Sequence, residues 1–199
     1  MEKDILYHLY NKGNNGQKIF FKRDNYIFFL QKVRNHLYPY CDILAYCLMP
    51  NHFHFLILAN AESEKIKKFG NKDANIFSEN LRIMLSSYTR AINKQENRTG
   101  SLFQQHSKIK PLNDIYYGRI SNPLRNISYA NYCFHYIHNN PVQANLVSAK
   151  ENWEFSSYKD YYGLRNGSLV NKELALKTIC LEEELYNTFE HSFKEFLET

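Results

Sequence analysis

Residues 43–59, with the sequence ILAYCLMPNHFHFLILA, decide the fold of this chain. Two apolar runs flank Pro50 and Asn51, a pair that is typical of the central positions of a tight turn. Each run has the length of a β-strand and is rich in branched and aromatic side chains. The stretch therefore predicts two antiparallel strands joined by a short connection.

The segments on either side extend this pair into an alternating order of strands and helices. Residues 5–11 resemble a strand that stops at the turn-forming cluster 12–16. Apolar residues then recur at helical spacing over residues 24–38, until a proline ends the pattern. We expect the polar residues 60–75 to form a loop with a short helical piece, and residues 77–92 to form a second amphipathic helix.

The second half of the pattern adds one strand and a third helix. Residues 101–111 are expected to form the fourth strand, and residues 112–126 a connecting loop. A third helix over residues 128–139 is expected to end near Asn140, because Pro141 disfavours helical geometry in the residue before it. The order β-α-β-β-α-β predicts an α+β, ferredoxin-like fold, a four-stranded antiparallel sheet covered on one face, with one added helix.

Length and composition indicate one globular domain with an appendage. The chain has 199 residues, of which 44% are hydrophobic and 16% aromatic, and this content excludes a disordered or collagen-like chain. We expect residues 1–165 to form the domain. Leucine and phenylalanine recur mostly at helical spacing in residues 166–199, which predicts a C-terminal helical extension.

Charge and cysteine content limit the possible environments and partners of the protein. Lys plus Arg exceeds Asp plus Glu by 25 − 20 = 5, which is compatible with an anionic partner. We find neither an apolar run of the roughly 18 residues that a membrane span needs nor a signal-peptide pattern after Met1, so we expect a cytoplasmic protein without a membrane partner. The four cysteines form no C-x-x-C pair, which favours reduced, buried thiols.

His52 and His54 are the first candidate site residues. Side chains two positions apart on a strand point to the same face, so both imidazoles can reach one ion while Phe53 points the other way. Imidazole suits divalent metals, and an added amide or oxygen ligand with open positions would admit magnesium or manganese. The pair is therefore a candidate divalent metal site, and histidines with ordinary packing or hydrogen-bonding roles fit the same pattern.

Tyr136 and Asn140 are the second pair of candidates. They are four residues apart on the predicted third helix and thus share a face, so a phenol and an amide carbonyl can project into one site. The spacing also fits a half-buried packing tyrosine. By itself it does not distinguish the two roles.

Three blocks of sequence, in this order, give the chain its resemblance to a known family: YHLYNKG at 7–13, YCLMPNHFH at 46–54 and YIHNNPV at 136–142. They resemble the single-tyrosine HUH transposases. With the further segments GSLFQ at 100–104 and 153–158, the chain is most similar to the REP-associated tyrosine transposases over about residues 5–160. Members commonly have a tryptophan where this chain has Phe103, a departure that leaves the catalytic residues untouched.

The resemblance implies roles for the candidate residues. It implies that His52 and His54 hold a divalent metal, magnesium or manganese, and that Tyr136 attacks DNA. Asn140 falls where the family has a third, polar metal ligand, which is glutamine in some relatives. The implied product is a 5′-phosphotyrosine with a free 3′-hydroxyl, which a second 3′-hydroxyl can reverse without ATP.

Single-stranded or hairpin DNA is the implied substrate, because a nucleophile on a helix needs an exposed strand. Basic residues that are candidates for contacts with the DNA backbone are Lys12, Lys18, Arg23, Arg90, Lys94, Arg98, Lys108 and Lys110. We expect a monomer or a homodimer, since both occur among the related transposases.

Two other functions fit parts of the same pattern. A domesticated relative would bind a DNA hairpin without cutting it, with the same fold and basic surface. A metallohydrolase acting on small molecules would use His52 and His54, but it would need a further set of carboxylates or histidines that the sequence does not show, and it would leave Tyr136 without a role.

Overall fold

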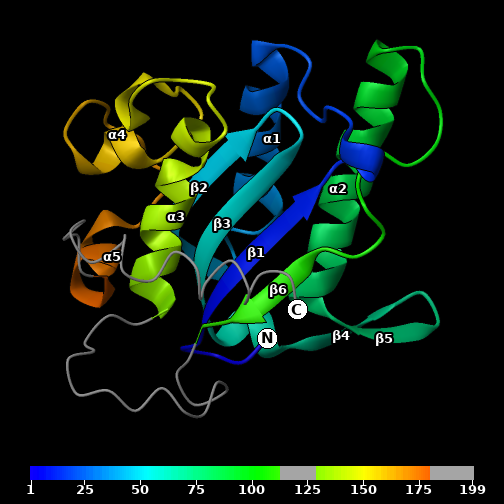
Figure 1. The fold of residues 1–199 in the computed structure, drawn as a ribbon. Coiled ribbons are helices and arrows are strands. Elements are labelled where there is room, and N and C mark those ends of the chain that lie inside the picture. Colours follow the sequence, from blue (N-terminus) through cyan, green and yellow to red (C-terminus); the bar gives the residue numbers. More distant parts are fainter. Residues whose placement is uncertain (113–128, 180–199) are drawn as a thin grey trace.

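The computed structural model describes residues 1–112 and 129–179. Four strands form an antiparallel sheet in the spatial order β2-β3-β1-β6, namely β1 (Leu6–Lys12), β2 (Cys41–Met49), β3 (His52–Ala59) and β6 (Lys108–Pro111). The first and third of these strands along the chain therefore lie in the middle (Figure 1). The α+β class and the four-stranded antiparallel sheet are confirmed.

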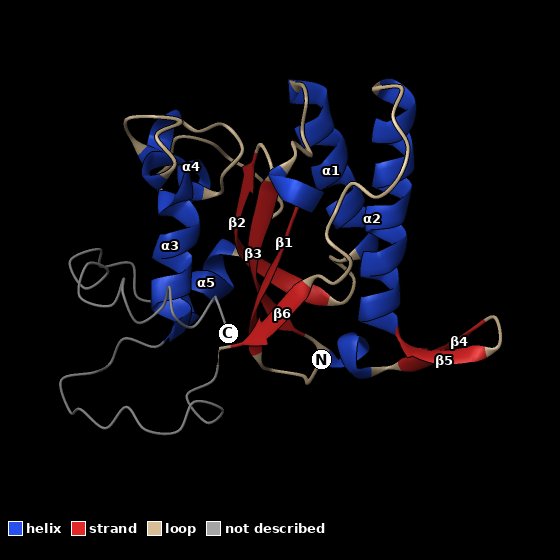
Figure 2. Cartoon of the chain, turned by 45° about the vertical axis from the view of Figure 1, so that its right-hand side comes forward, coloured by secondary structure: helices blue, strands red, loops and turns tan. Residues whose placement is uncertain are grey.

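Helices cover both faces of the sheet. Figure 2 shows α1 (Arg23–His36) and α2 (Ile76–Gln95) on one side and α3 (Tyr129–Gln143) on the other. On β3, Phe53 packs in the core under α1 and α2, whereas Leu56 packs in the core under α3. The expectation of a sheet covered on one face was wrong, because β2 is apolar on both faces and needs a helix on each.

The fourth strand is shorter than predicted. Only Lys108–Pro111 pairs with β1, and the preceding residues form a loop. A single bridge between Gly13 and Phe103 and the hydrogen bond from Asn14 N–H to the Leu102 carbonyl, 3.0 Å, hold that loop near the end of β1. The predicted loop at 112–126 lies outside the described residues except for Leu112.

Helix α3 continues past the point where the sequence rule ends it. It runs through Pro141 to Gln143, although the expected end was near Asn140. Asn140 and Pro141 are both buried, and the carbonyls of both accept backbone hydrogen bonds, from Ala144 and Leu146. These contacts offset the preference of the residue before a proline for extended rather than helical backbone.

Short elements make up the rest of the chain. The region 60–75 forms a 3-10 turn, η2 (Ala61–Glu64), and an unpredicted hairpin of β4 (Ile66–Phe69) and β5 (Lys72–Asn75). The hairpin projects away from the main sheet in Figure 1 and Figure 2. The remaining short helices are η1 (Asn14–Gly16), η3 (Lys150–Asn152), α4 (Tyr158–Tyr161) and α5 (Lys172–Thr178).

The predicted C-terminal extension is described only in part. Helix α5 packs against β2 through the buried Ala175, and residues 180–199 lie outside the described part of the chain. The division between residues 165 and 166 stays a prediction. No helix of the described residues is both long enough and apolar enough to cross a membrane.

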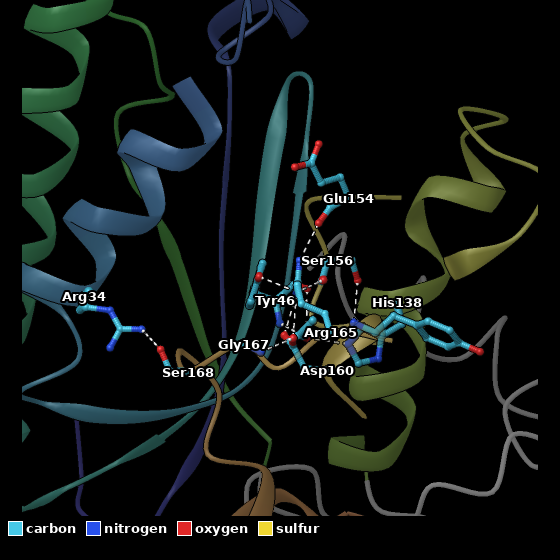
Figure 3. Close-up of polar contacts among 11 residues, drawn as sticks. Arg34, Tyr46, His138, Glu154, Ser156, Asp160, Arg165, Gly167 and Ser168 are labelled. Atoms are coloured by element: carbon cyan, nitrogen blue, oxygen red, sulfur yellow. Dashed lines mark hydrogen bonds and ion pairs between the residues drawn. The ribbon is translucent and has the colours of Figure 1, made fainter. Parts of the chain in front are cut away.

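An ion pair between the half-buried Arg165 and the buried Asp160 fastens the segment after α3 to β2. Asp160, 3% exposed, binds Arg165 through two hydrogen bonds of 2.7 Å and accepts the Gly167 N–H at 3.0 Å (Figure 3). The Arg165 guanidinium also donates to the Tyr46 hydroxyl at 3.0 Å and the Ser156 carbonyl at 2.6 Å. The hydrogen bonds to Asp160 are the main cause that raises the pKa of Arg165.

Candidate active site

Strand pairing places the two histidines of β3 beside polar residues of β1. In the register of these strands, His54 faces Tyr10 and His52 faces Lys12. The ring centroids of His52 and His54 lie 5.0 Å apart. Because Phe53 between them is in the core under α1 and α2, both imidazoles lie on the face that α3 covers.

Helix α3 brings Tyr136 and Asn140 to the same place. Asn140 Oδ1 lies 3.3 Å from His52 Nε2, across 88 residues of sequence. The Tyr136 ring stands edge-on to the His54 ring, with centroids 5.4 Å apart. All four predicted residues of the catalytic and metal sites therefore gather in one cluster, built from β3 and α3.

His138, between Tyr136 and Asn140 on α3, connects the helix to β2 through Ser157. His138 Nε2 lies 2.7 Å from Ser157 Oγ, which in turn accepts the Tyr46 N–H at 2.9 Å. Figure 3 shows His138 directed from the helix toward the segment that carries Ser156. Burial lowers the pKa of His138 well below its usual value, so the ring is neutral at pH 7. This link positions Tyr136 and Asn140 on the opposite side of the same helix turn.

His52 has an amide oxygen at each ring nitrogen. Nδ1 lies 2.7 Å from Asn51 Oδ1, and Nε2 lies 3.3 Å from Asn140 Oδ1. The Asn140 amide is oriented by its NH₂ group, which donates to the Tyr136 carbonyl at 3.0 Å. Burial lowers the pKa of His52, so the ring is neutral and carries one N–H.

If Nδ1 carries the single proton of His52, it donates to Asn51 Oδ1 over the shorter of the two distances. The lone pair of Nε2 then faces the amide oxygen of Asn140, so two acceptors are directed toward each other. A cation between or beside them would satisfy both. This is the feature of the described structure that fits a bound metal ion.

His54 has a buried imidazole as its partner. His54 Nδ1 lies 2.9 Å from Nε2 of His8, which is 0% exposed. Burial, with a smaller contribution from the charge of Lys110, lowers the pKa of His8 to about 3. Burial also lowers the pKa of His54, so both rings are neutral at pH 7.

The sequence interpretation did not select His8 or Asn51 as site residues. The alternation of side chains along β1 indicates that His8 and Tyr10 share a face, but only the pairing of β1 with β3 shows that this face is that of His54. Asn51 was assigned to the turn. Its side chain lies beside His52 because the turn brings consecutive residues together.

Three of the eight candidate DNA-contacting residues lie near this cluster. Lys108 and Lys110 on β6 pair with Tyr10 and His8, and Lys12 pairs with His52, so all three belong to the same face of the sheet or its rim. They give that edge of the site positive charge.

The other five cations lie elsewhere. The Arg23 Nε donates to Glu154 at 2.9 Å, and Arg98 donates to Gln17 at 2.8 Å. Arg90 lines a groove of about 770 Å³ between α2 and the loop before β6, on the opposite face of the sheet. Lys18 and Lys94 are exposed, after η1 and near the end of α2. The structure does not bring these residues to the cluster.

Within residues 1–112 and 129–179, no three His, Cys, Asp or Glu side chains form a group that could hold a metal ion. A cation at His52 and His54 would therefore depend on the Asn140 amide and on open positions. The described cysteines Cys41, Cys47 and Cys133 are buried and free.

Among known proteins, the chain has a match in fold but none in sequence family. No family model matches the chain, and no curated protein matches it either. Among solved structures, it resembles a REP-associated tyrosine transposase bound to a REP hairpin, with a TM-score of 0.53 and 16% sequence identity. The match covers 86% of this chain and 90% of that one. The chain thus has the fold of a REP-associated tyrosine transposase.

Proposed function

We propose that the protein is a transposase-type DNA strand transferase that cleaves and rejoins single-stranded or hairpin DNA with Tyr136 as its nucleophile. One observation carries this proposal: Tyr136, Asn140, His52 and His54 gather in a single cluster beside a lysine-bearing sheet edge. The fold that holds this cluster is shared with a transposase whose structure contains a DNA hairpin.

His52, His54 and Asn140 would hold Mg²⁺ or Mn²⁺. The facing acceptors, His52 Nε2 and Asn140 Oδ1, fit a cation, and the mixed imidazole and amide set leaves positions open for substrate oxygens. The bound ion would act as a Lewis acid on the scissile phosphate.

Tyr136 supplies the covalent step. Its phenolic oxygen attacks phosphorus, the phenolic proton is lost, and the bond from phosphorus to the 3′ oxygen breaks. The DNA 5′ phosphate is then esterified to Tyr136, and the released 3′ oxygen takes up a proton as a free hydroxyl. Because the number of phosphoester bonds is unchanged, a second 3′-hydroxyl can reverse the step without an external energy source.

Lys12, Lys108 and Lys110 would bind the phosphates next to the scissile bond. Tyr10 lies between these lysines and His54 in the strand register and offers an aromatic face to an unpaired base. This arrangement favours an exposed strand at the site over an intact duplex.

The experiment is a search for a covalent adduct. Labelled hairpin oligonucleotides with single-stranded flanks are incubated with the protein and Mg²⁺ or Mn²⁺, and chelator controls are run beside them. We expect a denaturant-resistant adduct that Tyr136→Phe and His52→Ala abolish, while Tyr136→Phe still binds the hairpin. Tyr132→Phe, one helical turn away, is the matched control and keeps the adduct. An adduct formed by Tyr136→Phe refutes the nucleophile assignment.

Binding without an adduct under either metal would instead indicate a non-cleaving hairpin-binding protein. We also propose that one chain forms a complete site, as a monomer or within a homodimer, because Tyr136 and His52 come together in a single chain. Mixing Tyr136→Phe with His52→Ala protein should then leave the adduct absent. Restored adduct formation would show a site shared between two subunits.

A further inference from the structure

We infer that His8 is a positioning residue for His54: its Nε2 accepts the Nδ1–H of His54 and thereby leaves the Nε2 lone pair of His54 available for a cation. This inference rests on the proposed function of the site. It assigns a role to a residue outside the metal ligands and the nucleophile.

The contact between the two rings is short and buried. The nitrogen atoms are 2.9 Å apart, and His8 and His54 are 0% and 5% exposed. His8 stacks on Tyr10, with centroids 4.6 Å apart, and its ring lies nearly parallel to that of His54, with centroids 5.0 Å apart and an angle of 22° between the ring planes. The ring is therefore held in place by packing, and a buried hydrogen bond of this kind resists exchange with water.

The direction of the hydrogen bond decides what His54 can do. If His54 donates, its proton is on Nδ1 and its Nε2 carries a lone pair. If His8 donates, the proton of neutral His54 is on Nε2, and that nitrogen cannot bind a cation. His8 Nε2 lies 2.9 Å from His54 Nδ1, within hydrogen-bonding distance, and in our inference it is the acceptor of the pair.

The same arrangement is found at the other histidine. Asn51 Oδ1 lies 2.7 Å from His52 Nδ1, and His8 Nε2 lies 2.9 Å from His54 Nδ1, so each Nδ1 has a possible acceptor beside it. Histidines that bind metals are usually oriented by a protein acceptor on their second ring nitrogen. Asn51 and His8 thus form a matched pair of acceptors behind the two imidazoles.

Two substitutions separate the hydrogen bond from the packing. In His8→Gln the side-chain amide reaches the position of Nε2 and can accept, whereas His8→Leu fills space without an acceptor. Mn²⁺ binding is measured by calorimetry without DNA, and the tautomer of His54 by ¹⁵N NMR of the metal-free protein. We expect His8→Leu to weaken Mn²⁺ binding by about 10- to 100-fold and His8→Gln to retain most of it.

The NMR measurement should show His54 protonated at Nδ1 in the wild type and in His8→Gln. In His8→Leu we expect that preference to be lost. Thermal unfolding of each variant is followed in parallel. Equal Mn²⁺ affinity in all three proteins, or equal losses in both variants that follow their thermal stability, would overturn the inference.

Failure of the proposed function is recognised separately. If the wild type neither binds Mn²⁺ nor forms the adduct, the metal-dependent function is wrong, and the NMR result still decides the role of His8. A wild-type His54 protonated at Nε2 overturns the inference. Protonation at Nδ1 that depends on an acceptor at position 8 supports it.

Discussion

Mild acid should destabilise this protein because several histidines are buried as neutral rings. His8, His54 and His138 are 0%, 5% and 2% exposed, and burial lowers the pKa of each, that of His8 to about 3. In the unfolded chain a histidine has a pKa near 6.5, so below that pH the unfolded state binds protons that the folded state does not. The contribution of these three histidines to stability is therefore fully present above about pH 6.5. It is lost as the pH drops toward their folded-state pKa values.

The size of the effect follows from the number of groups. For each histidine the loss at pH 5.5 is RT ln(1 + 10) with an unfolded pKa of 6.5, or about 1.4 kcal/mol. The three histidines together give a loss of about 4 kcal/mol between pH 7.5 and 5.5. Against a typical total of about 5–15 kcal/mol, this is a large share of the stability.

The assay is urea unfolding at pH 7.5, 6.5 and 5.5 with a chelator present, so that no metal contributes to stability. His138→Gln, which can keep a contact to Ser157 but cannot titrate, should reduce the pH-dependent loss by about 1.4 kcal/mol. The exposed His106→Gln is the matched control and should leave the loss unchanged. A total loss below about 1 kcal/mol over this range would refute the reasoning that these rings are neutral in the folded state.

Two further predictions concern the ion pair and the lysine edge. Asp160→Asn should lower the free energy of unfolding by about 2 kcal/mol in urea titrations, because it leaves the charge of Arg165, whose side chain is 31% exposed, without its carboxylate partner; a loss under about 1 kcal/mol contradicts this. Replacing Lys108 and Lys110 together by glutamine should weaken hairpin binding and reduce the salt dependence of log K by about 1.5. Lys94→Gln, far from the cluster, is the control, and an equal effect from it would contradict a DNA path along β6.

Local pattern was enough to predict the sheet and part of the site. The two apolar runs in residues 43–59 predict both strands, and the period of two along a strand places His52 and His54 on one face. The spacing of Tyr136 and Asn140 likewise predicts a shared helix face. Such features depend only on residues close in sequence, so they can be predicted without knowledge of the fold.

Only the tertiary structure decided which faces meet. The pairing of β1 with β3 brings His8 to His54, and the docking of α3 on β2 carries Asn140 to His52 and keeps the helix intact through Pro141. The tertiary structure also places Lys108 and Lys110 beside the cluster and other cations on the opposite face of the sheet. Strand register and helix docking arise from the sum of many contacts between distant segments, and no local periodicity contains that sum.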